Sequence, residues 1–324
     1  MKRICTVLAA LSAWLMPGYA LAQANYPERA IRILVGFTPG VAPDITSRLL
    51  ADKFTEAWGR PVVVENVTGA GGNIACDRTA KAAPDGYTLV MCGNGSLVIN
   101  PSLFEKMPFD PIKDLAPISQ VFVAANVLVV HPDVPAKTLP ELVALARARP
   151  GKLTYGHAGA GTSQHLAGEL FKYITKVDIR PIAYRGSTAV MPDLLAGRVD
   201  VFFGNVVNVL PLVREGKLRA FAVTSLKRSA AAADLPTMDE SGYPGFEAVP
   251  WFGLMAPAGT PPAIIDKLHR ETAKVLALPD IRKRLGELGV DPIGGTPAEL
   301  AAVIKTEMPQ WAKVIKDAGI KLSE

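Results

Sequence analysis

Three loops of small residues lead directly into helix starts, and these loops are where the chain could bind a ligand. They are residues 37–44 (FTPGVAPD), 159–163 (GAGTS) and 184–188 (YRGST). Backbone N–H groups at a helix start have no partner inside the helix, and small residues let an anion approach them. The pattern indicates a site for a carboxylate or phosphate, although short loops also require tight turns. Three such loops, divided between two halves of the chain, favour binding.

Several side chains in or near these loops could contact such a ligand. Thr162 and Ser163 could donate hydroxyl hydrogen bonds, or they could only cap the following helix. Tyr184 could line a cleft or belong to the core. Asn94 and Ser96 lie at the end of another predicted strand, where they could donate to the ligand.

The remaining loop residues have more ordinary interpretations. Asp44 is predicted to cap the helix that follows it, because its negative charge would repel an anionic ligand. Gly186 lies in the third loop and is counted with the binding residues. Arg185 could pair with a carboxylate but is typical of an exposed loop arginine, and His165 is typical of a satisfied polar residue in a helix.

The sequence lacks the usual patterns of catalysis and cofactor binding. It contains no G-x-S-x-G, H-E-x-x-H or G-x-x-x-x-G-K-[ST] motif, and no carboxylate spacing completes a metal site with its four histidines. Gly159 and Gly161 follow a strand and precede a helix, as in dinucleotide-binding loops, but Gln164 stands where the third glycine belongs. We therefore expect no catalytic residue, no metal and no cofactor.

The elements that must position these loops alternate between strand and helix. Apolar runs predict strands at 30–36, 61–65 and 87–91, with a helix after Asp44 and another at 73–82 that Asn73 could cap. Three strand–loop–helix units in this order predict a parallel sheet with helices on both faces.

The middle of the chain repeats this style. Helices are predicted at 139–148, 162–173 and 189–196, and strands at 153–155, 180–184, 199–203, 218–224 and 251–256. Residues 115–132 carry no Asp, Glu, Lys or Arg, but prolines and polar residues interrupt them, so we interpret them as a buried strand segment that could cross between domains. From residue 261 the chain is mostly helical.

Length and composition describe an ordinary globular protein of two domains. The chain has 324 residues, of which 49% are hydrophobic and 20% charged, and this excludes a disordered chain, a coiled coil and a collagen-like repeat. The formal net charge is +5, and it falls to +3 if Lys2 and Arg3 are removed with the N-terminal segment. Because basic residues form no cluster, no nucleic-acid partner is expected.

The N-terminus has the pattern of an export signal. Lys2 and Arg3 precede an uncharged, mostly apolar stretch at residues 4–16, and a cleavage site of small residues ends at Ala22. The apolar stretch is shorter than the roughly 20 residues of a membrane span. We therefore predict a signal peptide over residues 1–22 and a periplasmic protein, rather than an uncleaved anchor.

Export bears on the two cysteines of the mature chain. Cys76 is predicted in the first turn of a helix and Cys92 at the end of the next strand, which places both at one edge of the sheet. In an oxidising compartment they could form a disulfide, or they could remain buried thiols.

Modest motifs also occur in a specific order from Tyr26 to about Gly319. They include residues 26–27 (YP), 37–44 (FTPGVAPD), 62–73 (VVVENVTGAGGN), 82–88 (AAPDGYT), 155–168 (YGHAGAGTSQHLAG), 197–200 (GRVD) and 251–259 (WFGLMAPAG). Together they resemble the Bug family, the extracytoplasmic solute receptors of tripartite tricarboxylate transporters.

The resemblance implies a two-lobed α/β fold similar to type II periplasmic binding proteins, the Venus-flytrap arrangement. Each lobe would be a mostly parallel sheet flanked by helices. Residues 23–123 plus 228–324 would form domain I, and residues 124–227 would form domain II. Strands crossing near Ala124 and Val223 would act as the hinge.

The resemblance also implies a function and a site. A small carboxylated solute would be held between the lobes and passed to membrane subunits of the transporter. The implied site residues are Phe37, Gly40 and Val41 on one lobe and Gly159, Thr162 and Ser163 on the other. Val41 replaces a glycine usual in the family and adds bulk at the cleft mouth. An exported enzyme acting on a carboxylated molecule, or a ligand sensor for a signalling partner, are the alternatives.

Overall fold

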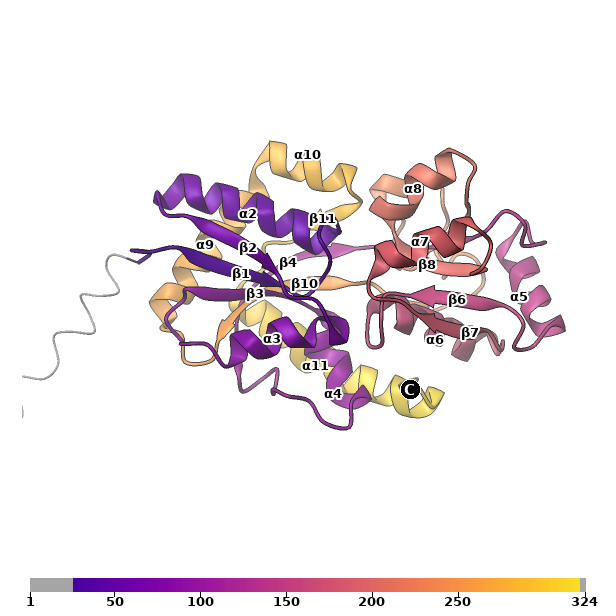
Figure 1. Cartoon of the computed structure of the whole chain (residues 1–324), viewed down its shortest axis with the longest axis horizontal. Helices are drawn as coiled ribbons and strands as arrows, with labels where there is room; N and C mark the ends of the chain where they lie inside the picture. Colours follow the sequence, from indigo (N-terminus) through magenta and orange to yellow (C-terminus); the bar gives the residue numbers. More distant parts are fainter. Residues whose placement is uncertain (1–25, 321–324) are drawn as a thin grey trace, which may run out of the picture.

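The structure, a computed structural model, describes residues 26–320, so the predicted signal peptide lies outside the described residues. Two lobes lie side by side, one built on a six-stranded sheet and the other on a five-stranded sheet (Figure 1). Helices flank both sheets, which confirms the predicted two-lobed α/β fold.

The first lobe contains both the beginning and the end of the described chain. Its strands lie in the order β11-β4-β10-β3-β1-β2. The strands are β1 (Ile31–Val35), β2 (Val62–Asn66), β3 (Thr88–Gly93), β4 (Leu115–Ala124), β10 (Trp251–Pro257) and β11 (Val290–Pro292). The helices are α2 (Ala42–Trp58), α3 (Asn73–Ala80), α4 (Asn100–Leu103), α9 (Pro262–Ala277), α10 (Pro279–Glu287) and α11 (Pro297–Ala318), with a short 3-10 helix, η1 (Ala70–Gly72), and a π-helical turn, η2 (Gly95–Ile99).

The second lobe contains the middle of the chain. Its strands lie in the order β7-β6-β8-β5-β9. They are β5 (Asn126–Val130), β6 (Thr154–His157), β7 (Arg180–Ala183), β8 (Val201–Asn205) and β9 (Arg219–Val223). The helices are α5 (Leu139–Ala148), α6 (Ser163–Thr175), α7 (Ser187–Leu195) and α8 (Val206–Arg214), followed by the 3-10 helix η3 (Ala230–Ala232).

Most strands of each sheet run in one direction, as predicted, and antiparallel strands enter both sheets. β1, β2 and β3 are mutually parallel, as are β6, β7 and β8, but β5 runs antiparallel to β8 and β10 runs antiparallel to β3. β5 and β10 are the strands that arrive from the other lobe. They enter their sheets at the carboxyl edge of the parallel strands, so they must run the opposite way.

Two connections join the lobes. β4 passes into β5 across a single residue, and residues 224–250 lead from β9 back to β10. Hydrogen bonds tie the connections together: the Asn126 N–H donates to the Thr224 hydroxyl over 3.2 Å, and the Ala124 N–H donates to the Pro250 carbonyl over 2.9 Å. The chain thus crosses between the lobes twice, and hydrogen bonds join the two crossings to each other.

The segment after β9 bears on the return boundary, which was predicted at residue 228. Met238, Phe246 and Ala248 are buried in the core of the second lobe, and Thr237 pairs with Val223 at the end of β9. This segment packs there because β9 is the edge strand of its sheet and a free edge favours a covering segment. We propose domain boundaries near residues 125 and 250.

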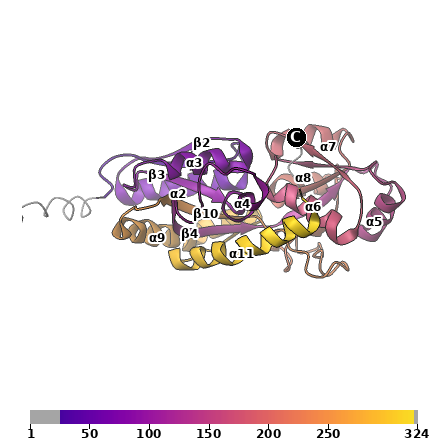
Figure 2. The ribbon, with the colours of Figure 1, turned by 90° about the horizontal axis from the view of Figure 1, so that it is seen from below.

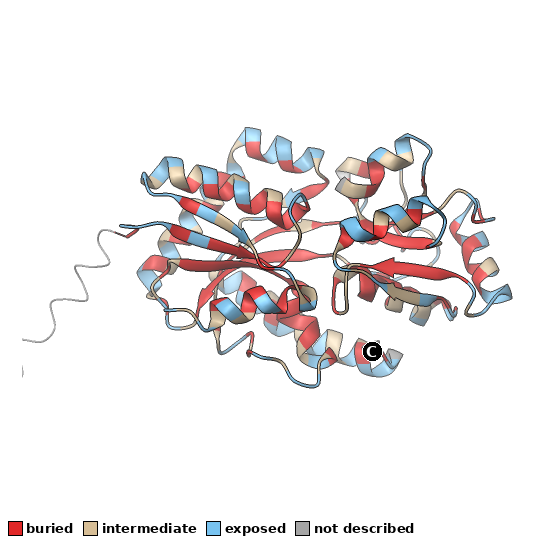
Figure 3. Cartoon of the chain, in the orientation of Figure 1, coloured by how far each residue is buried: buried red, intermediate tan, exposed pale blue. Residues whose placement is uncertain are grey.

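The buried faces of the elements explain why the chain adopts this fold. Central strands such as β5 and β10 are buried along their whole length, because helices cover both faces of each sheet. The helices bury one face and expose the other (Figure 3). α11 extends beneath both lobes (Figure 2), and Val314 packs against the cores of both. No helix within residues 26–320 is long and apolar enough to span a bilayer.

Some local predictions differ from the structure. The helix predicted to be capped by Asn73 begins at that residue, with Gly72 in the N-cap position. α8 and the π-helical turn η2 were not predicted. α8 follows β8 with no intervening loop, so no turn residues mark its start.

Candidate functional site

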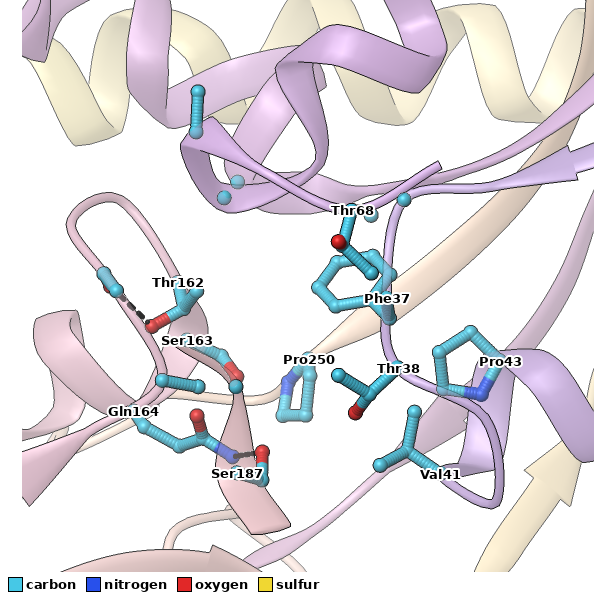
Figure 4. A pocket seen from close by; sticks show the side chains of 18 of the residues that line it. Phe37, Thr38, Val41, Pro43, Thr68, Thr162, Ser163, Gln164, Ser187 and Pro250 are labelled. Carbon is cyan, nitrogen blue, oxygen red and sulfur yellow. Dashed lines mark hydrogen bonds between the residues drawn. The ribbon is translucent and has the colours of Figure 1, made fainter. Parts of the chain in front are cut away.

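The carboxyl ends of the parallel strands in both sheets face a cleft of about 550 Å³ between the lobes (Figure 4). Loops after β1, β2 and β3 line it from the first lobe, and loops after β6, β7 and β8 line it from the second. Open α/β folds bind ligands at this edge of the sheet. The volume lies within the usual range of small-molecule sites.

Most of the predicted site residues line this cleft. They are Phe37, Val41, Asn94, Gly159, Thr162, Ser163, Tyr184 and Gly186. Gly40 and Ser96 do not line it. Gly40 is exposed, and its N–H donates to the Asp44 carboxylate. Ser96 is fully buried, because the π-helical turn directs it inward, where its hydroxyl contacts the Gly71 carbonyl at 3.5 Å.

Other lining residues were not counted among the site residues, although Thr38, Arg185 and Ser187 lie in the predicted ligand loops. They include Thr38, Thr68, Gly69, Ala70, Gly71, Phe104, Gln164, Arg185, Ser187, Asn205, Pro250 and Phe252. Residues 68–71 follow β2, so the strand-end rule that identified Asn94 also applies to them. Pro250 and Phe252 reach the cleft only because the chain returns from the second lobe, and no local sequence pattern marks that.

The first loop, residues 36–41, joins β1 to α2. The Phe37 ring meets the Phe252 ring edge-on, with centroids 5.3 Å apart. Val41 is the N-cap residue of α2, and no side chain caps this helix. The prediction that Asp44 is the cap is therefore wrong, since Asp44 is the third helical residue. Its carboxylate reaches back past Pro43, which has no N–H, and accepts from the Gly40 N–H at 2.9 Å.

Asp44 fixes the first loop through a network of hydrogen bonds centred on its buried carboxylate. Its side chain also accepts hydrogen bonds from Arg48 and Asn66, each at 2.9 Å, and Asn66 donates to the Phe37 carbonyl at 3.0 Å. Burial alone would raise the pKa of Asp44, but these hydrogen bonds and the positive charge of Arg48 hold the pKa below its usual value. Asp44 is thus ionised, and it offsets the positive end of the α2 dipole.

The histidine-backed loop, residues 158–162, occupies the corresponding position in the second lobe. The Gly159 N–H donates to His157 Nδ1 at 3.3 Å, and the Gly161 N–H donates to His165 Nδ1 at 3.4 Å. Both imidazoles are buried, and their ring centroids lie 4.6 Å apart.

The two histidines hold this loop in their neutral form. Burial lowers the pKa of both His157 and His165, and the neighbouring His157 and Lys172 help to bring the pKa of His165 to about 3. Since each Nδ1 accepts a hydrogen bond, each proton resides on Nε2. The sequence interpretation of His165 as a satisfied polar residue agrees with this geometry.

The starts of α6 and α7 present unpaired donors to the cleft. Thr162 is the N-cap of α6, accepting from the His165 N–H at 3.5 Å and donating to the Gly159 carbonyl at 2.7 Å. Gly186 is the N-cap residue of α7. Within residues 26–320, the backbone N–H groups of Ser163, Gln164 and Ser187 have no acceptor.

Side chains around these helix starts complete the second-lobe wall. Gln164 Nε2 donates to the Ser187 hydroxyl at 2.8 Å (Figure 4). The Tyr184 hydroxyl donates to Asp193 at 2.7 Å, and burial, with help from Asp193, raises the pKa of Tyr184 to about 12. Among the described lining residues, Arg185 alone carries a charged side chain.

The tip of the histidine-backed loop touches the first lobe and closes one side of the cleft. A Cβ on Gly161 would lie 1.9 Å from Asn100 Oδ1, and a Cβ on Gly95 would lie 2.4 Å from the Gly161 carbonyl oxygen. Asn100 is fully buried, and its Nδ2 donates to Asn73 Oδ1 at 2.8 Å. The two lobes approach this closely only because glycines line the contact.

Two further observations concern sulfur and metal chemistry. Cys76 and Cys92 are joined by a disulfide that ties α3 to β3 behind the cleft loops. Within the described part of the chain, no three His, Cys, Asp or Glu side chains lie close enough together to hold a metal ion.

Comparisons with known proteins place these features in context. The family model described as the tripartite tricarboxylate transporter family receptor matches residues 46–320. Protein BugT of Bordetella pertussis is 38% identical over 323 residues, 99% of each chain. The structure of R. palustris Rpa4515 with adipate is 36% identical, with a TM-score of 0.88, over 92% of this chain and 100% of that chain. MatC from Rhodopseudomonas palustris with bound malate is 32% identical, with a TM-score of 0.84, over 90% and 100%.

Proposed function

Because this chain belongs to the tripartite tricarboxylate transporter receptor family, we propose that it captures a small carboxylated solute between its lobes and delivers it to the membrane subunits of such a transporter. The mature protein would act in the periplasm after removal of the segment that ends at Ala22. Structures of two relatives, one with adipate and one with bound malate, support a carboxylate as the ligand.

The observation that carries this proposal is the pair of helix starts in the second-lobe wall. The N–H groups of Ser163, Gln164 and Ser187 are free, and they belong to the positive ends of two helices that open onto one cleft. Helix N-termini stabilise anions through these groups and through the helix dipole. A carboxylate placed there would receive several charge-assisted hydrogen bonds, each stronger than a neutral one.

Capture would couple binding to closure of the lobes. A solute held by α6 and α7 and touching the first loop would stabilise the closed arrangement over an open one, in proportion to its additional contacts in the closed state. The paired connections at Asn126 and Thr224 are the place where such a hinge would bend. The membrane subunits would then recognise the closed receptor.

One substitution tests the N–H donors directly. Ser163→Pro removes the first N–H of α6, whereas Ser163→Ala removes only the hydroxyl. Proline is tolerated at the first helical position, and α11 already begins with proline after a threonine cap, Thr296–Pro297. We expect Ser163→Pro to weaken carboxylate binding by roughly ten- to a hundredfold, the loss of one charge-assisted hydrogen bond. Ser163→Ala should have the smaller effect.

The measurement is calorimetric titration of the mature protein with adipate, malate, citrate and phenylacetate, with adipamide as the uncharged control. Binding of adipamide as tightly as adipate would contradict recognition of the carboxylate. Turnover of a bound acid would favour the alternative of an exported enzyme. Tight binding without any dependence of transport on the protein would favour the sensor alternative.

A further inference from the structure

The lining of the cleft also constrains the body of the ligand. Resting on the proposed carboxylate function, we propose that the solute is an acid with an apolar body, an alkyl chain or an unsubstituted aromatic ring, rather than a hydroxy acid. The two walls of the cleft have different chemistry, and the apolar wall belongs to the first lobe and the strand that returns to it.

The apolar wall faces the helix starts across the cleft. It is made by Phe37, Val41, Pro43, Pro250 and Phe252. In Figure 4, Phe37 and Val41 lie across from the polar groups of Ser163, Gln164 and Ser187, and Pro250 lies between the two sets. A carboxylate bound at the helix starts would therefore direct the rest of the molecule toward aromatic rings, proline rings and a branched aliphatic side chain.

Few polar groups remain on this wall to receive ligand hydroxyls. Among its described lining residues, the polar side chains are Thr38, Thr68 and Asn94. The Asn94 amide already donates to the Val249 carbonyl at 3.0 Å. The side-chain groups left for a ligand body on this wall are the two threonine hydroxyls and the second N–H and Oδ1 of Asn94. A buried hydroxyl without a partner destabilises a complex.

The size of the cleft agrees with a body larger than a two-carbon link. The cleft of about 550 Å³ has room for many water molecules, because one water needs only about 10–15 Å³. A six-carbon chain or a benzene ring would displace much of this water from apolar surface, and that displacement is favourable. A four-carbon acid would leave much of the apolar wall in contact with water.

The test uses acids matched in everything except hydroxyls. Adipate and galactarate have the same six carbons and two carboxylates, but galactarate carries four hydroxyls. We expect adipate and phenylacetate to bind at least about a hundredfold more tightly than galactarate and malate, because burying unpaired hydroxyls is costly. Calorimetry on the mature wild-type protein gives the four dissociation constants.

The outcomes separate this inference from the proposed function. Galactarate binding within about threefold of adipate would overturn the apolar-body inference and leave the carboxylate receptor standing. Binding of malate more tightly than of both adipate and phenylacetate would overturn it equally. If none of these acids nor citrate bound, the proposed function itself would fail.

Two variants test whether the apolar wall is responsible for the preference for adipate over galactarate. Val41→Thr places a hydroxyl in the wall without changing its shape, and Thr38→Val removes one. The ratio of galactarate to adipate dissociation constants should fall about fivefold in the first variant and rise in the second, as one hydrogen bond is gained or lost. Val63→Thr, on the exposed face of β2, is the matched control and should leave the ratio unchanged. Unchanged ratios in both wall variants would overturn the inference.

Discussion

The first loop and the histidine-backed loop perform the same task by opposite electrostatic means. Each leads from a parallel strand to a helix start at the cleft. The first is held by a buried ion, the Asp44 carboxylate, with Arg48 as its counter-charge. The second is held by two neutral imidazoles, His157 and His165, that only accept hydrogen bonds.

This difference determines which helix start remains available to an anion. In the first lobe, Asp44 already offsets the positive end of α2, and Pro43 supplies no N–H. In the second lobe, the histidines add no charge, so the positive ends of α6 and α7 are left for the ligand. The comparison therefore supports the proposal that the ligand carboxylate binds against the second lobe.

The largest expected effect comes from blocking the contact between the two lobes. In Gly161→Ala the new Cβ would collide with Asn100 Oδ1, and Asn100 is buried and cannot move aside. Because the proposed open state would separate Gly161 from Asn100, the collision would penalise closure alone, and ligand binding should weaken by about 2–3 kcal/mol, roughly a hundredfold. Calorimetry with the preferred acid measures the change, and small-angle scattering should show an opened cleft.

A second glycine of the same lobe provides the matched control. Gly216 has a backbone φ of 70°, close to the 74° of Gly161, but a Cβ there would meet no atom within 4 Å. Gly216→Ala should therefore reduce stability by the left-handed backbone term of about 1–2 kcal/mol and leave affinity intact. Equal affinities in the two variants would show that the Gly161 contact plays no part in closure.

The sequence predicted the position of these loops better than it predicted the side chains that hold them in place. The strand–loop–helix pattern identified the parallel strands and the residues at their carboxyl ends, such as Phe37 and Thr162, because a local pattern specifies both. The pattern also assigned Asp44 to the N-cap position. It does not reveal that α2 begins two residues before Asp44, so that the Asp44 carboxylate accepts from the Gly40 N–H before the helix. It also left His157 and His165 without a shared role, because that role appears only when β6 and α6 pack together.

The cleft residues that lie on the crossing strands could not be predicted, for a different reason. Pro250 and Phe252 reach the cleft only through the return of the chain from the second lobe. Their position depends on tertiary pairing of β10 with β3 and β4, and no pattern within ten residues of them encodes it. The same crossing makes β5 and β10 antiparallel to their neighbours β8 and β3.

The next effect separates the two loops by pH. The pKa values of His157 and His165 are lowered on folding, so the stability that they contribute is complete above the unfolded pKa of about 6.5 and is lost as pH falls through the folded pKa, which is about 3 for His165. Each histidine adds a slope of up to about 1.4 kcal/mol per pH unit in that window. The pKa of Asp44 is also lowered, but its contribution is lost only below about pH 4. Between about pH 6.5 and pH 4, the histidine-backed loop should therefore lose stability before the first loop does.

Urea unfolding from pH 7.5 to 4.5 tests this difference. His165→Gln keeps an acceptor for the Gly161 N–H but does not titrate, so it should flatten the decline in the free energy of unfolding. The charged neighbours of the pair, Glu169 and Lys172, remain in place in the variant. A decline as steep as that of the wild type would mean that His165 does not hold the loop in its neutral form.

The smallest expected effect comes from removing a helix cap. It compares a threonine that only caps a helix with one that also holds the ligand loop. Thr162 and Thr138 both cap helices through their hydroxyls, but only the Thr162 hydroxyl also holds a cleft residue, through the Gly159 carbonyl at 2.7 Å. Thr162→Ala and Thr138→Ala should each lower the free energy of unfolding by about 1 kcal/mol. Only Thr162→Ala should also weaken ligand binding, by roughly three- to tenfold, as one neutral hydrogen bond is lost from the loop. Thr162→Ala could instead lose stability and keep full affinity. The hydrogen bonds of the Thr162 hydroxyl would then stabilise only α6, and His157 and His165 alone would hold the loop in the shape that binds the anion.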